Sequence, residues 1–361
     1  MVVPQSSKLT VRVRFSPFPL VIQLNMEKIL ILTDAWSPQT NGVVTTLKNL
    51  VKELEKQYDV YVIHPGLFKN INLSFYKDIS LAIPISIFKM IDDYNPDYIH
   101  IVTEGPIGLS GKNYCQIKNK KYNTSFHTNF PHMMKDLFYV PEDITWETMR
   151  WFHESAETIL VTNKDIKDTL KNKNFKNRLV VWSRGIDTKK FFFTEKSTRP
   201  DKIALLCVSR VSKEKNLKEF CKLSLNEKYE CVLIGDGPHL EKLRAKYPKV
   251  RFIGKVENSK LRSWYASADV FFFPSLFDTF GIVMIESMAC GTPVVAYNVT
   301  GPKTIVENSV NGYLINSKDE VDKAILKASI LNRVRVSESV KKYTWKNVAK
   351  IFVDNLTKAT S

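Results

Sequence analysis

The chain has 361 residues, 44% hydrophobic and 25% charged, and its 53 Lys and Arg against 37 Asp and Glu give a formal net charge of +16. This length exceeds one ordinary hydrophobic core and predicts two globular domains. It contains no run of about 18 apolar residues, so no segment is predicted to span a bilayer. Five cysteines are scattered without a C-x-x-C pair, which favours buried thiols in a reducing compartment over a disulfide framework.

The positive charge is compatible with three partners: nucleic acid, an anionic membrane or a phosphorylated substrate. The lysines are spread along the chain, and neither an RNP-like aromatic strand nor zinc-finger spacing accompanies them. Nucleic acid is therefore the weakest of the three partners. An AT-rich genome, which enriches lysine, would explain the charge without any partner.

Residues 1–25 carry Arg12, Arg14 and the short apolar patch FPLVIQL, but no signal-peptide core followed by a small-residue cleavage site. The first convincing strand begins just after Met26. We therefore expect residues 1–25 to be a disordered leader, such as an extension from an upstream start, that lies outside the fold.

From Met26 onward, short apolar runs alternate with amphipathic stretches, which predicts strands separated by helices. Strands that are apolar throughout and separated by helices indicate a parallel sheet covered on both faces. The predicted strands are 28–34, 59–66, 98–105, 123–129, 158–163 and 178–185. The predicted helices include 42–57, 106–119 and 143–154.

A polar, charged stretch between Gly185 and Lys202 suits a connection between domains, and a second alternation of strands and helices follows it. Its predicted strands are 202–210, 230–238, 250–256, 269–275, 292–298 and 312–315. The segment 343–356 has the apolar spacing of one more amphipathic helix.

We therefore predict an α/β fold of two Rossmann-like domains whose parallel sheets face a central cleft, because open parallel sheets bind ligands at the carboxyl ends of their strands. The C-terminal helix is expected to return to the first domain. The domains are predicted at 26–190 and 191–342, with the C-terminal helix in 343–361.

The segment DTFGIVMIESMACGTPV (278–294) places Asp278 and Glu286 eight positions apart in an apolar stretch. Gly281 follows a strand and a turn, and the helical pattern after it predicts a helix N-terminus, where free amides and a positive dipole favour a phosphate. Both carboxylates can then face one ligand and accept hydrogen bonds from paired sugar hydroxyls. The alternative is a capping Asp and a solvated helix Glu.

The segment SRVSKEKN (209–216) directly follows the first strand of the second domain and places Arg210 and Lys215 at its carboxyl end. Two cations at a strand end suit a diphosphate. Taken alone, such a segment is more often a solvated basic turn.

Three residues of the first domain are weaker candidates. Gly42 lies where the first strand meets the first helix, so backbone amides there can approach an anion, although any tight turn can use a glycine. His127 ends a strand and could hydrogen-bond a sugar or a developing charge, or its ring could simply pack. Glu104 also ends a strand and could project toward a ligand or cap the next helix. The acids of IDDYNPD (91–97) lie in a polar turn and offer no metal cage.

Together these motifs resemble the retaining glycosyltransferases of family 4, which have the GT-B fold, over the chain from about Met26 to its end. The motifs that carry the resemblance are DTFGIVMIESMACGTPV, SRVSKEKN, IGDGP (234–238) and WSRGID (182–187). HIVTEGPIG (100–108) with SFHTNFP (125–131) is similar to a subgroup that includes sulfoquinovosyl- and glucosyl-diacylglycerol synthases and some mannosyltransferases.

The resemblance implies that Glu286 holds the nucleotide ribose and that Arg210 and Lys215 neutralise the diphosphate. It implies a catalytic position for His127, near the reacting sugar, and closure by Gly42 from the other domain. Asp278 stands where the family has its first glutamate, so the identity of the sugar stays open. Asp278 and the amides of the helix start would contact the donor sugar and phosphate, those amides belonging to Thr279, Phe280, Gly281, Ile282 and Val283.

The expected reaction is metal-independent hexosyl transfer with retention, from UDP-glucose or UDP-glucuronate to a lipid such as diacylglycerol, with no cofactor. GDP-mannose is the alternative donor, and a non-catalytic sugar-nucleotide-binding scaffold is the alternative class. The basic charge suits an anionic membrane surface, so we expect a cytoplasmic protein, peripheral on the inner face of the plasma membrane. The segment 126–141 is expected to lie near the acceptor.

Overall fold

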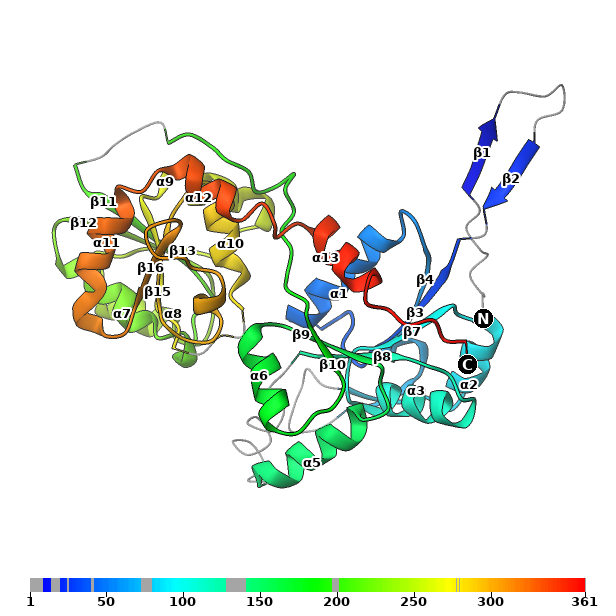
Figure 1. Cartoon of the computed structure of the whole chain (residues 1–361). Helices are drawn as coiled ribbons and strands as arrows, with labels where there is room; N and C mark the ends of the chain where they lie inside the picture. Colours follow the sequence, from blue (N-terminus) through cyan, green and yellow to red (C-terminus); the bar gives the residue numbers. More distant parts are fainter. Residues whose placement is uncertain are drawn as a thin grey trace. The chain divides into compact units, whose positions relative to one another are not determined.

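The computed structural model of the chain (Figure 1) describes residues 9–13, 20–24, 26–39, 42–72, 80–127, 141–196, 201–276, 278 and 280–360. The chain divides into two compact units, each with its own core. Unit 1 comprises Met1–Trp182 and Val348–Ser361, and unit 2 comprises Ser183–Asn347.

Unit 1 is built on a six-stranded sheet of order β10-β9-β8-β7-β3-β4, in which every pairing is parallel. The strand order reverses between β3 and β7, which makes that position the switch point of this sheet. Its strands are β3 (Lys28–Leu32), β4 (Asp59–Ile63), β7 (Tyr98–Ile101), β8 (Asn123–Phe126), β9 (Thr158–Val161) and β10 (Arg178–Val181).

Helices connect these strands and cover the sheet, as parallel pairing requires. Leu30 and Leu32 of β3 belong to a core cluster with residues of α2 and α3, while residues of α5 and α6 pack with Ile159 and Val161. The helices are α1 (Gly42–Leu54), α2 (Ile87–Tyr94), α3 (Pro106–Ile117), α5 (Glu142–His153) and α6 (Lys164–Asn172).

Unit 2 is built on a second parallel sheet, of order β13-β12-β11-β14-β15-β16. Numbered along the chain this order is 3-2-1-4-5-6, which is that of dinucleotide-binding folds, and the switch point lies between β11 and β14. The strands are β11 (Ile203–Val208), β12 (Tyr229–Ile234), β13 (Arg251–Gly254), β14 (Val270–Phe273), β15 (Val294–Tyr297) and β16 (Gly312–Ile315).

Alternate residues of these strands feed two cores, one on each face of the sheet. Leu206 and Val208 pack with helices α9, α10 and α12, whereas Leu205 and Cys207 pack with α7, α8 and α11. The helices are α7 (Leu217–Lys222), α8 (Leu240–Lys246), α9 (Leu261–Ser267), α10 (Ile282–Ala289), α11 (Val321–Ser329) and α12 (Arg333–Ser339). The α/β prediction of two Rossmann-like units with parallel sheets is confirmed.

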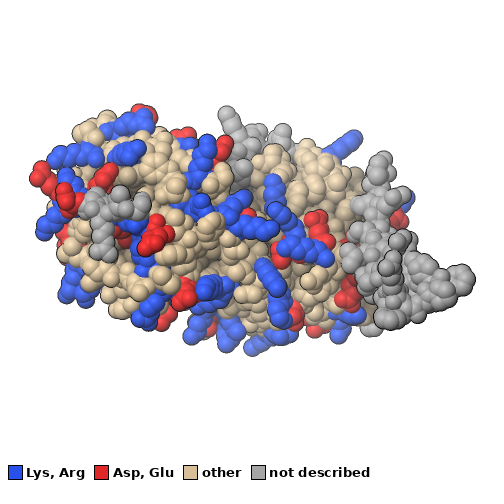
Figure 2. Space-filling view, turned by 90° about the horizontal axis from the view of Figure 1, so that it is seen from above, with Lys and Arg blue, Asp and Glu red and all other residues tan. Residues whose placement is uncertain are grey.

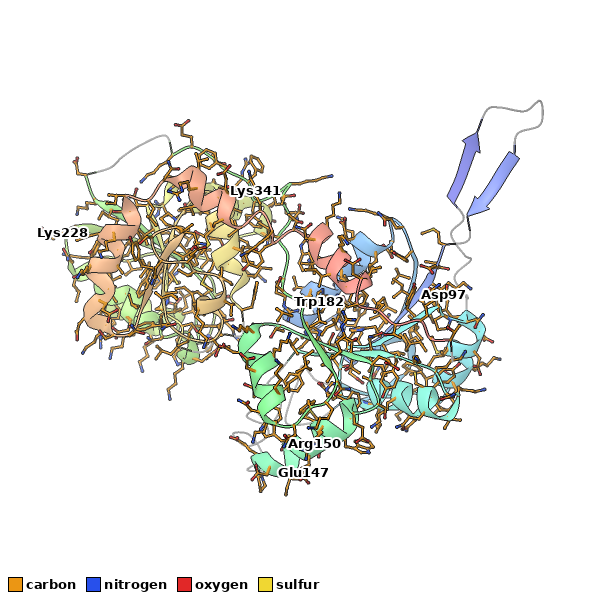
Figure 3. The ribbon with its side chains drawn as sticks, viewed as in Figure 1. Asp97, Glu147, Arg150, Trp182, Lys228 and Lys341 are labelled. Atoms are coloured by element: carbon orange, nitrogen blue, oxygen red, sulfur yellow. The ribbon has the colours of Figure 1, made fainter. Side chains whose placement is uncertain are left out.

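The chain returns to unit 1 within α13 (Trp345–Val353). The indole of Trp182, labelled in Figure 3, donates a hydrogen bond to the carbonyl oxygen of Val348 at 3.0 Å. The ring of Phe352 packs against the rings of Trp182 and His100, and the amide of Thr357 donates to Asn123 on β8 at 2.8 Å. The last residues of the chain therefore complete the core of unit 1.

Two features differ from the sequence-based expectation. Within the leader, Leu9–Val13 (β1) and Leu20–Leu24 (β2) form an antiparallel pair, where we expected disorder; both segments are rich in Val, Leu and Ile, which favour strands. The other residues of 1–25 lie outside the described residues. The units also divide at Trp182 and Asn347 rather than at 190 and 342, because Trp182 packs with the C-terminal segment.

A second antiparallel pair, β5 (Lys69–Asn72) with β6 (Ser80–Ile83), forms a small additional sheet in unit 1. Among the residues that the structure describes, none of the helices combines the length and the apolar character needed to cross a membrane.

Candidate active site

The switch point of unit 2 gathers the cations and carboxylates that the sequence singled out. Arg210 follows β11 by two residues and is exposed, and Lys215 closes the short 3-10 turn η2 (Lys213–Lys215) in the same loop. The ammonium of Lys215 donates to Oδ2 of Asp278 at 2.8 Å, which joins the loop after β11 to the loop after β14. The two strand ends that flank the switch point are therefore linked by an ion pair.

This ion pair is partly shielded from water, since the side chain of Lys215 is 24% exposed and that of Asp278 is 16% exposed. Oδ1 of Asp278 also accepts the backbone amide of Phe280 at 3.1 Å, so both carboxylate oxygens are in use. A second tie between the same loops is the hydrogen bond from Asn216 Nδ2 to the carbonyl of Pro274, at 3.1 Å.

The helix α10 begins directly after this ion pair. Gly281, with a φ of +83°, takes the left-handed conformation that turns the chain into the helix. Within the described residues, no side chain caps this N-terminus, so the first amides of the helix, including those of the half-buried Ile282 and Val283, are available to an anion. Thr279 lies outside the described residues.

Glu286 lies one turn further along α10 and is 5% exposed. The hydroxyl of Tyr265, on α9, donates to its Oε2 at 2.9 Å. Burial raises the pKa of Glu286 to about 7, although hydrogen bonds from Tyr265 and Asn258 and the charge of Lys190 act in the opposite direction. Glu286 is therefore neither a solvated helix residue nor an orphaned charge.

Two glycines hold the Arg210 loop by close backbone approach. A Cβ on Gly235 would lie 1.8 Å from the carbonyl oxygen of Ser209, and one on Gly237 would lie 2.5 Å from that of Val211. The amide of Val211 in turn donates to the carbonyl of Asp236 at 2.9 Å. The IGDGP motif thus acts as a backbone support for the loop that carries Arg210.

The switch point of unit 1 is arranged differently, because Asp34 occupies the N-terminus of its helix α3. Oδ1 accepts the amide of Ile107 at 2.9 Å, while Oδ2 accepts the hydroxyl of Thr103 at 2.8 Å and the amide of Gly108 at 3.3 Å. Burial raises the pKa of Asp34 even though these hydrogen bonds oppose the shift. At this helix N-terminus the amides of Ile107 and Gly108 already donate to Asp34, so they are not free to bind an anion.

The remaining sequence candidates lie in unit 1. Gly42 is the exposed first residue of α1, and a Cβ at this position would have no described atom within 4 Å. His127 follows β8, is 8% exposed and packs its ring on that of Trp182, with centroids 5.6 Å apart. Glu104 pairs with the buried His153 at 3.3 Å and makes no cap for α3.

The structure thus joins Lys215, Asp278 and Phe280 directly and places Glu286 in the helix that follows them, with Arg210 in the loop that carries Lys215. Gly42 and His127 belong to the other unit. Sequence reasoning missed Tyr265 and Asp34. Asp34 was detectable as an acid directly after a strand, whereas Tyr265 has the pattern of an ordinary buried aromatic residue.

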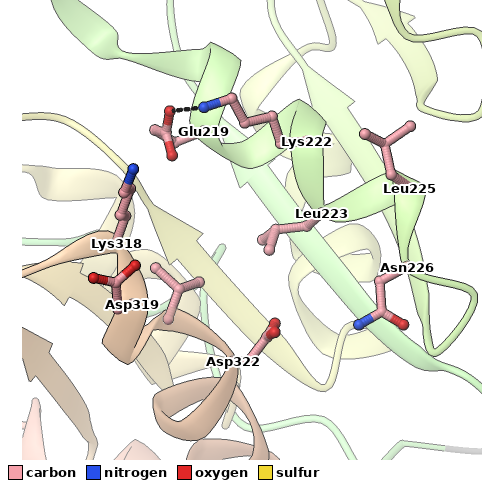
Figure 4. A pocket seen from close by; sticks show the side chains of 9 residues that line it. Glu219, Lys222, Leu223, Leu225, Asn226, Lys318, Asp319 and Asp322 are labelled. Carbon is pink, nitrogen blue, oxygen red and sulfur yellow. Dashed lines mark hydrogen bonds and ion pairs between the residues drawn. The ribbon is translucent and has the colours of Figure 1, made fainter.

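Two cavities lie away from these residues. One, of about 590 Å³, is lined by Glu219, Lys222, Asp322 and neighbours from α7 and α11 (Figure 4), and its charges are of both signs. The other, of about 710 Å³, is lined by residues such as Lys202 and Asp269, which precede strands and so mark the amino ends of the sheet. Within the part of the chain that the structure describes, no group of three or more His, Cys, Asp or Glu residues is placed to hold a metal ion.

Two family models match adjacent parts of the chain. The model described as Glycosyltransferase Family 4 matches residues 40–190, and the one described as Glycosyl transferases group 1 matches residues 188–344. The chain belongs to the family 4 glycosyltransferases. The predicted family and the prediction of a transferase enzyme are confirmed.

Curated relatives of this family 4 glycosyltransferase cover most of its length. A GDP-mannose-dependent alpha-mannosyltransferase of Corynebacterium glutamicum is 24% identical over 81% of this chain and 77% of its own. A sulfoquinovosyl transferase of Arabidopsis thaliana is 29% identical over 84% of this chain and 64% of its own. An alpha-monoglucosyldiacylglycerol synthase of Streptococcus pneumoniae is 25% identical over 90% of this chain and 84% of its own.

Solved structures share the fold of this glycosyltransferase. Sucrose-phosphate synthase from Thermosynechococcus elongatus matches with a TM-score of 0.70 at 18% identity, over 91% of this chain and 98% of that one. HepE of Anabaena, solved in complex with UDP-glucose, matches with a TM-score of 0.67 at 17% identity, over the same shares of the two chains. These likenesses confirm the GT-B fold class.

Proposed function

We propose that this glycosyltransferase moves a hexose from a nucleotide-diphosphate sugar to a lipid acceptor, with retention at the anomeric carbon. The observation that carries the donor class is the unit 2 switch point. There, Arg210 and Lys215 lie in the loop after β11, Lys215 pairs with Asp278, and the uncapped N-terminus of α10 precedes Glu286. Cations and free amides suit a diphosphate, and carboxylates suit the hydroxyls of a ribose and a hexose.

The residues of unit 2 divide the donor between them. Arg210 and Lys215 bind the diphosphate together with the amides of Ile282 and Val283 at the start of α10. The amide of Phe280, also expected to contact the phosphate, instead donates to Asp278. Glu286 binds the ribose. Asp278 stays near the donor sugar while held by Lys215, because an ammonium group has three donors and can bind a carboxylate and a phosphate together.

In the reaction, the bond between the anomeric carbon and the phosphate oxygen breaks, and a bond from that carbon to the acceptor hydroxyl oxygen forms on the same face. The leaving diphosphate oxygen takes the acceptor's proton, so no separate general base is required. The two cations and the helix dipole stabilise the departing negative charge. We propose that these groups suffice without a metal and that His127 and Gly42 of unit 1 act on the sugar side.

The identities of sugar and acceptor rest on the relatives. One of them is named as an alpha-monoglucosyldiacylglycerol synthase, which supports a glucose donor and diacylglycerol as acceptor. We propose UDP-glucose or UDP-glucuronate as the donor. Another relative is named for GDP-mannose, and this supports a mannosyltransferase as the second candidate. Incubation of the purified protein with UDP- and GDP-sugars and lipid acceptors, followed by mass spectrometry of the lipids, distinguishes the two.

The same assay tests the non-catalytic alternative. Glu286→Ala should abolish product formation, whereas Glu338→Ala, an exposed glutamate on α12, should not. A scaffold would form no product with any donor in the parent protein.

Unchanged turnover after EDTA treatment would support the metal-free proposal, and loss of turnover restored by added divalent cation would refute it.

We also propose that the protein acts at the inner face of the cytoplasmic membrane. Figure 2 shows Lys and Arg distributed over the visible face with fewer Asp and Glu between them, in keeping with the net charge of +16. Of the segment 126–141 proposed to lie near the acceptor, residues 128–140 lie outside the described residues. Co-sedimentation with vesicles should require anionic lipid and weaken with salt; binding indifferent to anionic lipid would refute docking.

A further inference from the structure

The buried carboxyl of Glu286 is held by a tyrosine from another helix. Tyr265 on α9 is fully buried, and its hydroxyl lies 2.9 Å from Oε2 of Glu286, 21 residues away in the chain. The pKa of Tyr265 is raised well above its ordinary value by burial and by the charge of Glu286. The phenol is therefore protonated at neutral pH, and it is the donor in this hydrogen bond.

The backbone around Tyr265 is itself fixed. The hydroxyl of Thr292 donates to the carbonyl oxygen of Tyr265, and the guanidinium of Arg333 donates to the carbonyls of Ala266 and Ala268 at 2.8 Å. The aromatic ring packs edge-on against Phe191 and Phe271. The hydroxyl thus approaches Glu286 from a rigid support and has little freedom to follow a carboxylate that moves.

We propose that Tyr265 is a positioning residue for donor binding: its hydroxyl holds Oε2 of Glu286 so that the other carboxylate oxygen is presented to the paired hydroxyls of a ribose. This inference rests on the proposed role of Glu286 in nucleotide binding. A carboxylate without this tie would rotate among several rotamers, and ordering it would cost binding free energy. The base of the nucleotide plays no part, so UDP and GDP should depend on Tyr265 alike.

The groups that face Glu286 decide how the tie affects its titration. Tyr265 comes from α9, Asn258 from the turn before α9, Lys190 from the segment before β11, and Cys290 from the end of α10. Tyr265, Asn258 and Lys190 favour the charged carboxylate, against the burial that raises its pKa to about 7. Removing the phenol hydroxyl removes one of these three and should raise the pKa further.

The test is UDP binding by calorimetry, with the Tyr265→Phe variant of the full chain, between pH 6 and 9. The variant keeps the buried ring and loses only the hydroxyl. At pH 7 we expect about a tenfold loss of affinity, as for a hydrogen bond to a charged group. The midpoint of the pH dependence should move upward by about one unit, so that part of the affinity returns at pH 9.

The matched control is Tyr229→Phe. Tyr229 is also buried and also donates to a carboxylate at 2.9 Å, that of Asp322 on α11, but it packs on the other face of the sheet. This variant should bind UDP as the parent does, with the same pH midpoint. Circular dichroism of both variants reports whether the fold is intact.

A double-mutant cycle separates this inference from the proposed function. Glu286→Gln should weaken UDP binding, and Tyr265→Phe added to it should weaken binding no further. If Glu286→Gln weakens binding while Tyr265→Phe leaves affinity and pH midpoint unchanged, the positioning role is wrong and the nucleotide site stands. If Glu286→Gln also leaves UDP and GDP binding unchanged, the nucleotide site itself is misassigned.

Discussion

The buried charge of Glu286 lowers the stability of the folded state at neutral and alkaline pH, and a role in donor binding would explain why a glutamate stands there. Its pKa of about 7 exceeds the ordinary value of 4.5, so between these values the folded state binds a proton more tightly than the unfolded chain does. The stability from this protonation is complete below pH 4.5 and is lost as the pH rises through 7. A neutral replacement should avoid this loss.

Glu286→Gln should therefore be more stable than the parent at pH 8, by as much as ~3 kcal/mol if the whole shift is realised, and much less so at pH 5. Urea unfolding at the two pH values measures the difference. A stability difference equal at pH 5 and pH 8 would show that Glu286 does not titrate in this range. Donor binding should be impaired at both pH values.

The ion pair of Lys215 with Asp278 leads to the opposite expectation, a large effect on activity and a small one on stability. Lys215→Ala should lower kcat/KM for donor by about 100-fold or more, since it removes a charge from the leaving diphosphate. The pair is only partly shielded from water, so it contributes only about 1 kcal/mol to folding. Steady-state kinetics and thermal unfolding measure the two effects.

The control is Lys213→Ala, an exposed lysine on the same 3-10 turn, which should leave kcat/KM within about twofold because a solvated charge there is screened. Equal losses in both variants would mean that the general positive charge of the loop, and not the position of Lys215, is what matters.

Residue chemistry was predictable from the sequence where a side chain directly follows a strand. Arg210 and Lys215 were found in this way, because parallel strands end at one edge of a sheet. Asp278 was found from its spacing to Glu286 in an apolar stretch. The contact between Lys215 and Asp278 was not predicted, since 63 residues separate them and only the fold brings their loops together. Tyr265 was missed because a buried aromatic residue on a helix is far more often part of a core.

At the scale of elements, every predicted strand of the two large sheets is present, but most end earlier than predicted. β11 ends at Val208 rather than at 210, and β12 at Ile234 rather than at 238. The cause is that the residues after these strands leave the sheet to build the site loops. The small β1-β2 and β5-β6 pairs were not predicted, since the sequence was interpreted as strands alternating with helices, which is the pattern of parallel sheets and not of antiparallel pairs.

Gly235 shows how tightly these loops are built. Its φ of +142° and the carbonyl oxygen of Ser209, which would lie 1.8 Å from an added Cβ, leave no room for a side chain. Gly235→Ala should displace the loop that carries Arg210, lower donor affinity at least tenfold and destabilise unit 2 by about 2 kcal/mol or more. Nucleotide titration and urea unfolding test both effects.

Gly254→Ala separates backbone strain from crowding. Gly254 also has a positive φ, +83°, but no described atom lies within 4 Å of a Cβ there. It should cost only the ~1 kcal/mol of the left-handed conformation and leave nucleotide affinity unchanged. A loss of affinity in this variant as large as that of Gly235→Ala would attribute the effect to strain alone.

The two switch points also differ in a way that divides labour between the units. Asp34 fills the helix N-terminus at the switch point of unit 1, whereas α10 of unit 2 is left uncapped by any described side chain. We therefore expect a diphosphate to bind to unit 2 and propose that unit 1 binds the other substrate. This contrast could not be read from the sequence, because Asp34 and Asp278 both follow strands and look alike.

At the scale of the whole molecule, unit 1 depends on the C-terminal segment for its core. Phe352 is fully buried between Trp182 and His100. Phe352→Ala should destabilise unit 1 by about 3 to 5 kcal/mol, the usual cost of deleting a buried aromatic ring. Urea unfolding followed by hydrogen exchange, which reports each unit separately, measures this loss.

Ile117→Ala, in which the replaced side chain is 71% exposed in the same unit, is the control and should cost less than about 0.5 kcal/mol. If both variants were equally stable, the packing of the C-terminal segment on unit 1 would be dispensable.

The net charge of +16 is a property of the whole molecule. Figure 2 shows Lys and Arg spread over the visible face and not gathered into one arm.

The discontinuity of unit 1 has a consequence for biosynthesis. A ribosome makes residues 26–182 before unit 2, yet the ring that packs beside Trp182 and His100 belongs to Phe352, which is made after unit 2. Unit 2 is continuous and can mature while translation is still under way. Unit 1 should therefore complete its core only after the whole of unit 2 has been synthesised.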